Sequence, residues 1–266
     1  MSNKLKAKPF IKWAGGKRSL INQLKKRIPK SFTGYYEPFV GGGILFYSIS
    51  KKKSYLSDIN YRLILTYQCI KNNPDKIVKN LLMHNLGHSK DYYIKCKNLF
   101  NKEVDPIKIS SLFIYLNKTC FNGLYRVNRS GNFNVPMGNY KNPLIFDEKN
   151  LYNVSLMLKT TEIMQHSFEY TPIEKKGFYY LDPPYYKTFN QYTYDGFDEK
   201  SHERLAIFCE KINKMGAYFM LSYSDEKFIK NLYCNYYIEN VSALHFISCK
   251  SHKREKKNEI IIRNYK

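Results

Sequence analysis

Hydrophobic residues recur along the first part of the chain at two spacings, which predict helices and strands in alternation. Apolar residues between Leu20 and Ile28 share one helical face, and Pro29 ends that pattern. Strands that alternate with helices are typical of α/β folds with a parallel sheet. The predicted elements here are a helix over residues 17–28, strands over 35–40 and 53–57, and a helix over 61–71.

The pattern changes between residues 72 and 149. Three helical segments, at residues 74–86, 90–100 and 107–116, follow one another with no strand between them. A glycine- and proline-containing stretch comes next, in which residues 125–135 suit a hairpin that turns at Ser130-Gly131. We interpret residues 72–149 as an inserted domain, and residues 1–71 and 150–266 as the two parts of the main domain.

Alternation resumes after the insertion and again favours an α/β fold. The segments in this part are strands at 178–181 and 218–222, helices at 199–215 and 226–233, and closing strands at 236–241, 244–247 and 259–262.

Charge points to a polyanionic partner. The 266 residues include 44 Lys and Arg against 22 Asp and Glu, a net charge of +22. Codon bias in an AT-rich genome is the alternative explanation for the many lysines. A basic run at residues 250–257 is either a solvated loop or a phosphate contact.

Composition also sets expectations about compartment and metal. No apolar run reaches about 18 residues, and no secretion signal begins the chain, so we expect a cytoplasmic protein that does not span a membrane. The six cysteines form no C-x-x-C pair, which suits free thiols. His84 and His88 have no third ligand nearby, so we expect no metal.

The segment Asp182-Pro183-Pro184-Tyr185 is the most informative chemical feature. It follows the uncharged strand 178–181, which places it at the carboxyl end of a buried strand, where open sheets bind ligands. The prolines stiffen the backbone and remove two N–H donors, so the corner presents acceptors. Two fixed acceptors suit the two N–H donors of an exocyclic amine, and Tyr185 suits stacking on a base. A Pro-Pro turn capped by Asp182 is the alternative.

The segment 37–43 is a predicted strand that runs into three glycines and a helix. Such glycines allow positive φ and close approach of the backbone to a ligand, although the spacing is neither G-x-G-x-x-G nor a Walker A loop. Asp58 ends the next strand, where acidic residues accept hydrogen bonds from ribose hydroxyls. Asp58 as the N-cap of the next helix is the alternative.

These motifs together resemble a known family. Residues 10–17, Phe-Ile-Lys-Trp-Ala-Gly-Gly-Lys, are similar to the N-terminal cofactor motif of Dam-type, D12 class adenine methyltransferases. The other segments fall in that family's α-group order: 37–43, 58–60, 117–126, 133–140, 182–185 and 258–265. The resemblance implies an α/β fold, namely a Rossmann-like S-adenosylmethionine-dependent methyltransferase sheet. It also implies an inserted, mainly helical DNA-recognition domain that carries a β-hairpin.

The resemblance also implies residue roles. The implied catalytic residues are Asp182, Pro183, Pro184 and Tyr185. The implied S-adenosylmethionine contacts are Trp13, Lys17 (at the carboxylate), Glu37, Phe39, Gly41, Gly43, Asp58 (at the ribose), Phe168 and Asp182. The implied DNA contacts are Lys12, Asn122, Leu124, Arg126, Asn128, Pro136 and Tyr140. Relatives commonly carry Asp-Phe where this chain has Ser167-Phe168, so a contact near the cofactor adenine is in question.

The predicted function is transfer of a methyl group from S-adenosylmethionine to N6 of adenine in duplex DNA, within GATC, by base flipping and direct transfer. We expect double-stranded DNA as partner, a monomer, and either a separate cognate restriction endonuclease or none. One alternative is an amino methyltransferase that acts on another base or on RNA. A DNA-binding homologue without catalysis is the other.

Overall fold

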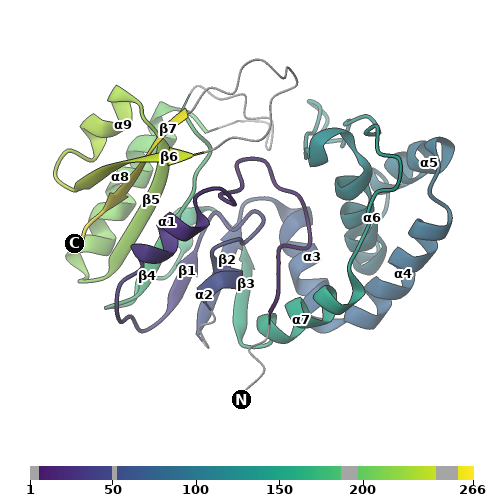
Figure 1. Cartoon of the computed structure of the whole chain (residues 1–266), viewed down its shortest axis with the longest axis horizontal. Coiled ribbons are helices and arrows are strands. Elements are labelled where there is room, and N and C mark those ends of the chain that lie inside the picture. The colour runs from purple at the N-terminus through teal and green to yellow at the C-terminus, as the bar shows by residue number, and fades with distance from the viewer. Residues whose placement is uncertain (1–5, 50–52, 187–196, 244–256) are drawn as a thin grey trace.

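The computed structural model describes residues 6–49, 53–186, 197–243 and 257–266 (Figure 1). The helices are α1 (Ile21–Lys26), α2 (Phe46–Ile49), α3 (Tyr61–Asn72), α4 (Pro74–Leu86), α5 (Lys90–Phe100), α6 (Pro106–Thr119), α7 (Glu148–Leu158), α8 (Glu199–Lys214) and α9 (Lys227–Leu232), with 3-10 turns η1 (Phe121–Gly123) and η2 (Phe168–Tyr170). The strands are β1 (Tyr35–Glu37), β2 (Ser54–Asp58), β3 (Thr161–Gln165), β4 (Phe178–Leu181), β5 (Tyr218–Ser224), β6 (Tyr237–Ala243) and β7 (Lys257–Arg263).

Within the described residues, seven strands form one mixed sheet in the order β3-β2-β1-β4-β5-β7-β6. The first five strands in this order run parallel, whereas β7 runs antiparallel to both β5 and β6. The strand order reverses between β1 and β4. A doubly wound sheet opens a crevice at the carboxyl ends of the strands on either side of such a reversal, so the topology locates a ligand site before any side chain is considered.

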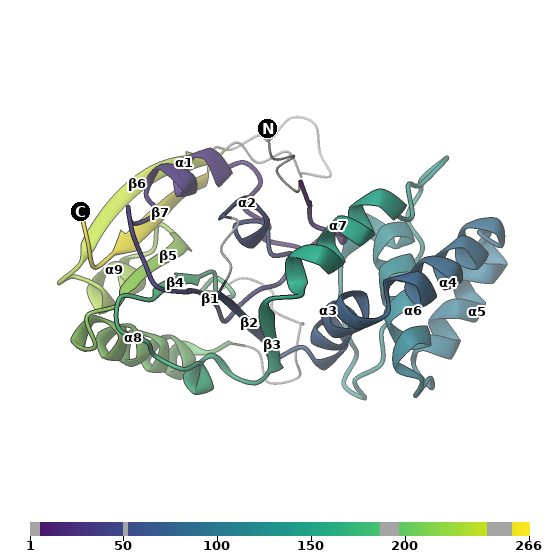
Figure 2. The same cartoon turned by 90° about the horizontal axis from the view of Figure 1, so that it is seen from below.

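Alternate side chains of the central strands belong to two apolar clusters, one on each face of the sheet. Tyr35, Phe178 and Tyr180 belong to one cluster, whereas Tyr36 and Tyr179 belong to the other. Helices α1 and α2 cover one face, and α8 covers the opposite face (Figure 2). Burial on both faces explains why β4, Phe178–Leu181, carries no charge.

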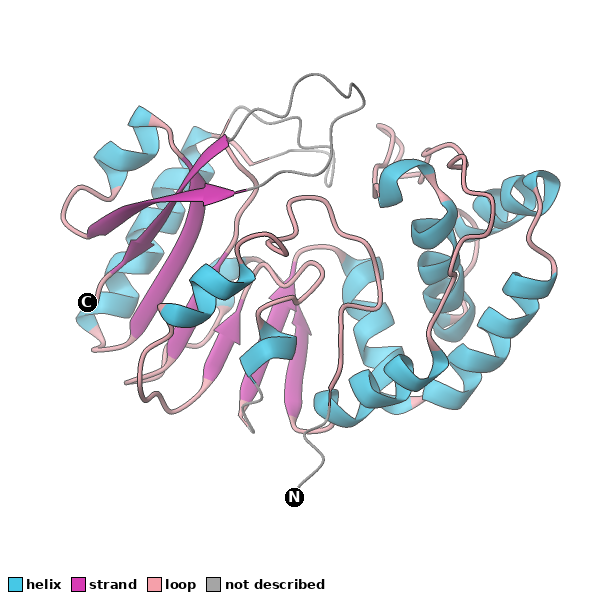
Figure 3. Cartoon of the chain, viewed as in Figure 1, coloured by secondary structure: helices cyan, strands magenta, loops and turns pink. Residues whose placement is uncertain are grey.

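Helices α4, α5 and α6 pack together on the far side of the chain from β5–β7 (Figures 1 and 3). Helix α6 packs against α3, α4 and α5, and most of its side chains are therefore buried. Asp105 caps its start by accepting a hydrogen bond from the Lys108 N–H at 2.8 Å. The apolar cluster on one face of the sheet continues through α3 into these helices, with Leu56 and Leu116 as members of the same cluster.

The long periodic helices agree closely with their predicted bounds, as α3, α4 and α5 show. The pattern missed α7 and the edge strand β3, in which Glu162 and Met164 are exposed on the face that does not pack on the core. The helix predicted over residues 17–28 is confirmed only between Ile21 and Lys26. Residues before it form turns that direct Lys17 towards Asp182. The strand predicted at 244–247 and most of the basic run 250–257 lie outside the described residues.

Residues 125–135 double back as predicted. Val127 and Phe133 form an antiparallel bridge, and the Asn128 N–H donates to the Asn132 carbonyl at 2.9 Å. Gly131 lies at the turn with φ of +73°, a conformation that glycine adopts without the steric penalty of a side chain.

Candidate active site

A cavity of about 1090 Å³ lies at the strand-order reversal, over the carboxyl ends of β1, β2 and β4. The N-terminal segment, purple in Figure 1, crosses over these strand ends before it enters α1. The predicted cofactor and catalytic residues all line this cavity: Trp13, Lys17, Glu37, Phe39, Gly41, Gly43, Asp58, Phe168, Asp182, Pro183, Pro184 and Tyr185. Segments far apart in the sequence therefore meet at this cavity.

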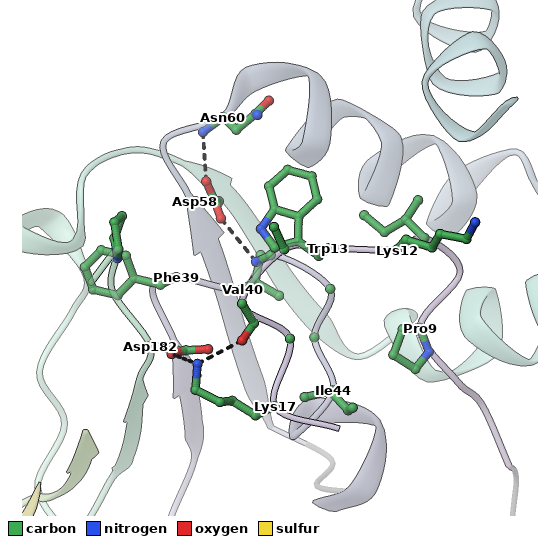
Figure 4. Close-up of a pocket in the computed structure, with 18 of the residues that line it drawn as sticks. Pro9, Lys12, Trp13, Lys17, Phe39, Val40, Ile44, Asp58, Asn60 and Asp182 are labelled. Atoms are coloured by element: carbon green, nitrogen blue, oxygen red, sulfur yellow. Dashed lines mark hydrogen bonds and ion pairs between the residues drawn. The ribbon is translucent and has the colours of Figure 1, made fainter. Parts of the chain in front are cut away.

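Lys17 and Asp182 form an ion pair at the centre of the site (Figure 4). Lys17 Nζ lies 2.7 Å from Asp182 Oδ1 and donates to the Gly15 carbonyl at 2.8 Å. The Lys17 side chain is only 4% exposed, so the pair is shielded from water. Burial raises the pKa of Asp182 to about 6, and the Lys17 ammonium opposes that shift. Asp182 is therefore mostly ionised at neutral pH.

Neighbouring strands hold the Asp182–Tyr185 corner. The Tyr185 hydroxyl donates to Glu259 Oε2 at 2.9 Å, and Glu259 on β7 is buried. Tyr223 on β5 stacks on the Tyr185 ring, with centroids 5.0 Å apart, and donates its hydroxyl to the Pro184 carbonyl at 3.1 Å. The Lys17 ammonium lies 4.5 Å from the centroid of the Tyr185 ring. The corner thus has fixed side-chain and backbone positions.

The glycine turn after β1 is shaped by close contacts. Gly41 has φ of +45°, and a Cβ added there would lie 2.5 Å from Trp13 Cδ1. Gly43 has φ of +64°, and its Cβ would meet the Tyr67 hydroxyl at 2.9 Å. Side chains at these positions would displace Trp13 and Tyr67, so the turn requires glycine.

Asp58 ties the end of β2 to the glycine turn. Its two oxygens accept hydrogen bonds from the Asn60 N–H at 3.0 Å and from the Gly41 N–H at 3.1 Å. Burial raises the pKa of Asp58 to about 6. The interpretation of Asp58 as a helix cap is wrong, because Asn60 caps α3 through the Leu63 N–H at 3.1 Å.

Glu37 is a buried acid at the floor of the cavity, 2% exposed. The Tyr35 hydroxyl donates to its Oε2 at 2.7 Å. Burial raises the pKa of Glu37 to about 8, so the carboxyl is largely protonated at neutral pH. Two acids so near each other therefore differ in charge, with Glu37 neutral and Asp182 ionised.

Two aromatic rings, Phe39 and Phe168, stack at one end of the cavity with centroids 5.4 Å apart. Ser167 also lines this end, and its hydroxyl donates to Glu169 Oε2 at 3.1 Å. The side chain at the position where relatives carry Asp is therefore bonded to a carboxylate two residues further along.

The residues predicted to contact DNA separate into two groups. Lys12 and Tyr140 line the cavity, with the Lys12 ammonium 4.1 Å from the centroid of the Tyr140 ring. The cavity lining does not include the others, which lie on η1 and the loops after it: Asn122, Leu124, Arg126, Asn128 and Pro136.

Several of these loop residues have intramolecular contacts. The Arg126 Nε–H donates to Asn134 Oδ1 at 2.8 Å. Asn128 Oδ1 accepts from the N–H groups of Ser130 and Asn132, which orders the turn. Asn122 is exposed with φ of +53°. The side-chain oxygen of Asn128 therefore stabilises the hairpin turn, a role that the sequence did not indicate.

The cavity also includes cations that sequence reasoning did not assign. Lys118, Arg18 and Arg204 line it together with His166. Burial lowers the pKa of Lys118 to about 8, and the nearby Lys12 and Arg18 add to the shift. Lys118 lies within the segment 117–126, which is part of the family resemblance. That motif is the sequence signal from which Lys118 could have been assigned to the site.

Metal ligation has no support among the residues that the structure describes, since no group of three or more His, Cys, Asp or Glu side chains comes together there. His84 and His88 instead pair with the hydroxyls of Tyr92 and Tyr115, each at 2.9 Å. In the described part of the chain, no helix is long and apolar enough to cross a membrane.

The mostly parallel, doubly wound sheet, with an added antiparallel β7 and a cavity at the β1–β4 reversal, is consistent with a Rossmann-like methyltransferase. The chain belongs to the D12 class N6 adenine-specific DNA methyltransferase family, whose pattern it matches over residues 13–247.

Named relatives match along nearly their whole length. The type II methyltransferase M.MjaIII of Methanocaldococcus jannaschii is 42% identical over 98% of this chain and 100% of its own. The type II methyltransferase M1.LlaDCHI of Lactococcus lactis is 34% identical over 99% of this chain and 97% of its own. The DNA adenine methylase of Escherichia coli is 31% identical over 96% of this chain and 95% of its own.

Proposed function

We propose that the protein transfers a methyl group from S-adenosylmethionine to N6 of adenine in duplex DNA, and that GATC is its recognition sequence. One relationship carries the proposal: the glycine turn at Gly41–Gly43 and the corner at Asp182–Tyr185 line a single cavity, and Lys17 touches Asp182 within it. A methyl donor and an amine acceptor must meet in one enclosed space for direct transfer to occur.

The side chains that line the cavity suit S-adenosylmethionine. The Lys17 ammonium would hold the carboxylate of the methionine part, and Asp58 would accept from the ribose hydroxyls. Phe39 and Phe168 offer ring faces for the adenine. S-adenosylmethionine supplies a methyl group already activated on a sulfonium, so no protein nucleophile is needed. Trp13, packed against Gly41, would close this end of the site.

Asp182 would act on the amine. Its carboxylate and a backbone carbonyl of the Pro183-Pro184 corner would accept the two N–H groups of adenine N6. These bonds localise the nitrogen lone pair, which is otherwise delocalised into the ring, and stabilise charge that develops on nitrogen. The nitrogen would form its bond to the methyl carbon as the S–C bond breaks, which leaves the bonding pair on a neutral thioether sulfur, and Asp182 would take the displaced N–H proton and pass it to water. Tyr185 would pack on the base.

The target base must leave the duplex, at a cost of a few kcal/mol. The net charge of +22 would offset this through phosphate contacts. We assign residues 72–149 to target recognition and the remainder to catalysis. Lys12 and Tyr140 at the cavity rim, with Arg126 on the hairpin, would contact the DNA. We also propose that the protein acts as a monomer. Two relatives are named type II methyltransferases, and on this basis a separate cognate restriction endonuclease is a second proposal.

Product analysis tests the function. Duplex DNA exposed to the protein and S-adenosylmethionine should yield N6-methyladenine on digestion to nucleosides, and the mapped positions should lie in GATC. The Asp182→Ala variant is the control: it should bind DNA and make no product. N4-methylcytosine, methylated RNA bases, or binding without any product would each overturn the proposal in a different way.

A further inference from the structure

Asn117 on α6 makes three hydrogen bonds to backbone groups outside its own helix. Its Oδ1 accepts from the Lys12 N–H at 2.8 Å, and its Nδ2 donates to the Lys12 carbonyl at 2.7 Å and the Gly123 carbonyl at 3.0 Å. A primary amide has two N–H donors, and both are engaged here. The residue is 3% exposed, so losing these bonds would leave polar groups buried without partners.

The backbones that Asn117 joins also touch each other. Gly123 has φ of +64°, and a Cβ added there would lie 2.5 Å from Lys12 Cβ. The Lys12 side chain therefore packs on the bare backbone of Gly123. Its position depends on both the amide of Asn117 and the absence of a side chain at residue 123.

Each backbone held by Asn117 leads into a different part of the site. Trp13 follows Lys12, lines the cavity, and packs against Phe113 and Tyr125, with ring centroids at 6.3 and 6.0 Å. Leu124 follows Gly123 and begins the segment that carries Arg126. The cofactor end of the cavity and the hairpin segment are thus anchored to a single side chain. Figure 4 shows Lys12 and Trp13 side by side on the N-terminal segment, with Asp58 beyond Trp13.

We propose that Asn117 is a positioning residue that couples cofactor binding to DNA-sequence discrimination. This inference rests on the proposed function, since it takes Trp13 as a cofactor contact and residues 124–126 as readers of DNA. Asn117 itself would touch neither ligand. It sets the spacing between the two segments, so its loss should weaken both activities together.

The chain offers a matched control. Asn150 on α7 holds the backbone of Lys8 by the same pair of bonds, accepting from its N–H at 2.8 Å and donating to its carbonyl at 3.0 Å. Lys8 is on the same N-terminal segment, but neither Lys8 nor Asn150 lines the cavity. Asn150→Ala therefore removes the same pair of bonds from the same segment, at a more exposed position, without changing the link to Gly123.

The test compares Asn117→Ala with Asn150→Ala. We expect Asn117→Ala to weaken S-adenosylmethionine binding by about tenfold and to lower the preference for GATC over one-base variants by about tenfold, since buried groups lose their bonds. Trp13 is the only tryptophan in the chain, so its fluorescence reports the cofactor end directly. The emission of Asn117→Ala should differ from that of the wild type without any ligand, whereas Asn150→Ala should match the wild type.

If Asn117→Ala does not fold, Gly123→Ala provides a second route, because its methyl group would push on Lys12 while the amide of Asn117 stays. It should give the same joint loss. Unchanged cofactor affinity and discrimination in the folded Asn117 or Gly123 variant would overturn the proposal and leave Asn117 a residue of folding only. A wild-type protein that methylates no adenine would instead overturn the proposed function, while the comparison of Trp13 emission would still test the clamp.

Discussion

The hydroxyl of Tyr223 donates to the carbonyl of Pro184 at 3.1 Å, so β5 supports the corner that follows β4. The same hydroxyl lies 3.0 Å from each ring nitrogen of the buried His202. Burial lowers the pKa of His202 to about 4, so its ring is neutral and carries one N–H. A hydroxyl has one hydrogen, which Pro184 receives, so the tyrosine oxygen accepts from His202. A short chain of hydrogen bonds thus runs from α8 to the Asp182 corner.

Removing the Tyr223 hydroxyl tests whether this support matters for catalysis. Tyr223→Phe keeps the ring that stacks on Tyr185 but frees the Pro184 carbonyl, and one such bond contributes about 1 kcal/mol. We expect kcat to fall about fivefold with unchanged affinity for S-adenosylmethionine. The control is Tyr265→Phe, which loses a hydroxyl bond to the Arg27 carbonyl at 2.8 Å, away from the cavity. Equal kcat for the two variants would contradict a role for Tyr223.

Tyr185 and Glu259 should act as one unit in catalysis. Their bond of 2.9 Å fixes the Tyr185 ring beside Asp182. In a double-mutant cycle, Tyr185→Phe, Glu259→Ala and the double variant should lose similar amounts of kcat, with a coupling of about 1–3 kcal/mol. Glu259→Gln keeps an acceptor oxygen and should recover part of the rate. Additive losses would show that the two side chains act separately.

The pKa of Asp182, raised to about 6, predicts an acid limb in the rate. The ionised carboxylate is the stronger acceptor for an N–H, and only this form can take the proton that N6 loses, so kcat at saturating S-adenosylmethionine should fall as pH drops through about 6. Asp58 also titrates near 6, but its effect should appear in cofactor affinity rather than in kcat. Direct titration with S-adenosylmethionine at each pH separates the two acids. A flat kcat between pH 5 and 7 would argue against the role of the Asp182 carboxylate.

The sequence alone sufficed for features that depend on local pattern. Helices α3, α4 and α5 carry strong periodicity, and the uncharged strand before Asp182 identifies a buried β4. The sequence pattern missed β3, because the apolar Met164 lies on the exposed face and breaks the alternation that a half-buried strand otherwise shows. The motifs identified the residues that line the site, but they did not identify the side chains that hold those residues in place. Glu259 and Tyr223 lie far along the chain, and only the β4-β5-β7 order brings them to the corner.

Glu37 should make stability depend on pH. Its pKa in the folded chain is about 8, well above its ordinary value, so the folded state binds a proton that the unfolded state releases. This contribution to stability is fully present below about pH 4.5 and is lost as pH rises towards 8. Glu37→Gln removes that titration and should flatten the decline of Tm between pH 5 and 8. An unchanged slope in the variant would mean that other groups cause it.

Arg126 should read one G·C pair. Its Nε–H is held by Asn134 at 2.8 Å, which orients the guanidinium from the half-buried base of the hairpin. An arginine held in this way can donate to guanine O6 and N7 together. Arg126→Ala should therefore reduce discrimination at a single position by about 1–3 kcal/mol, measured as the ratio of kcat/KM on GATC to that on substituted sites.

Arg129 provides the comparison for this prediction, because it is exposed at the tip of the same hairpin. An arginine at the tip that contacts only phosphate contributes the same free energy of binding on every DNA sequence. Arg129→Ala should weaken binding to all DNAs alike and lower the slope of log affinity against log salt by about one, while the preference for GATC stays constant. Asn134→Ala, which removes the partner of the Arg126 Nε–H, should relax the same base pair as Arg126→Ala but by less. If Arg126→Ala instead behaves like Arg129→Ala, the arginine is a phosphate contact, and the specificity must come from other residues of the insertion.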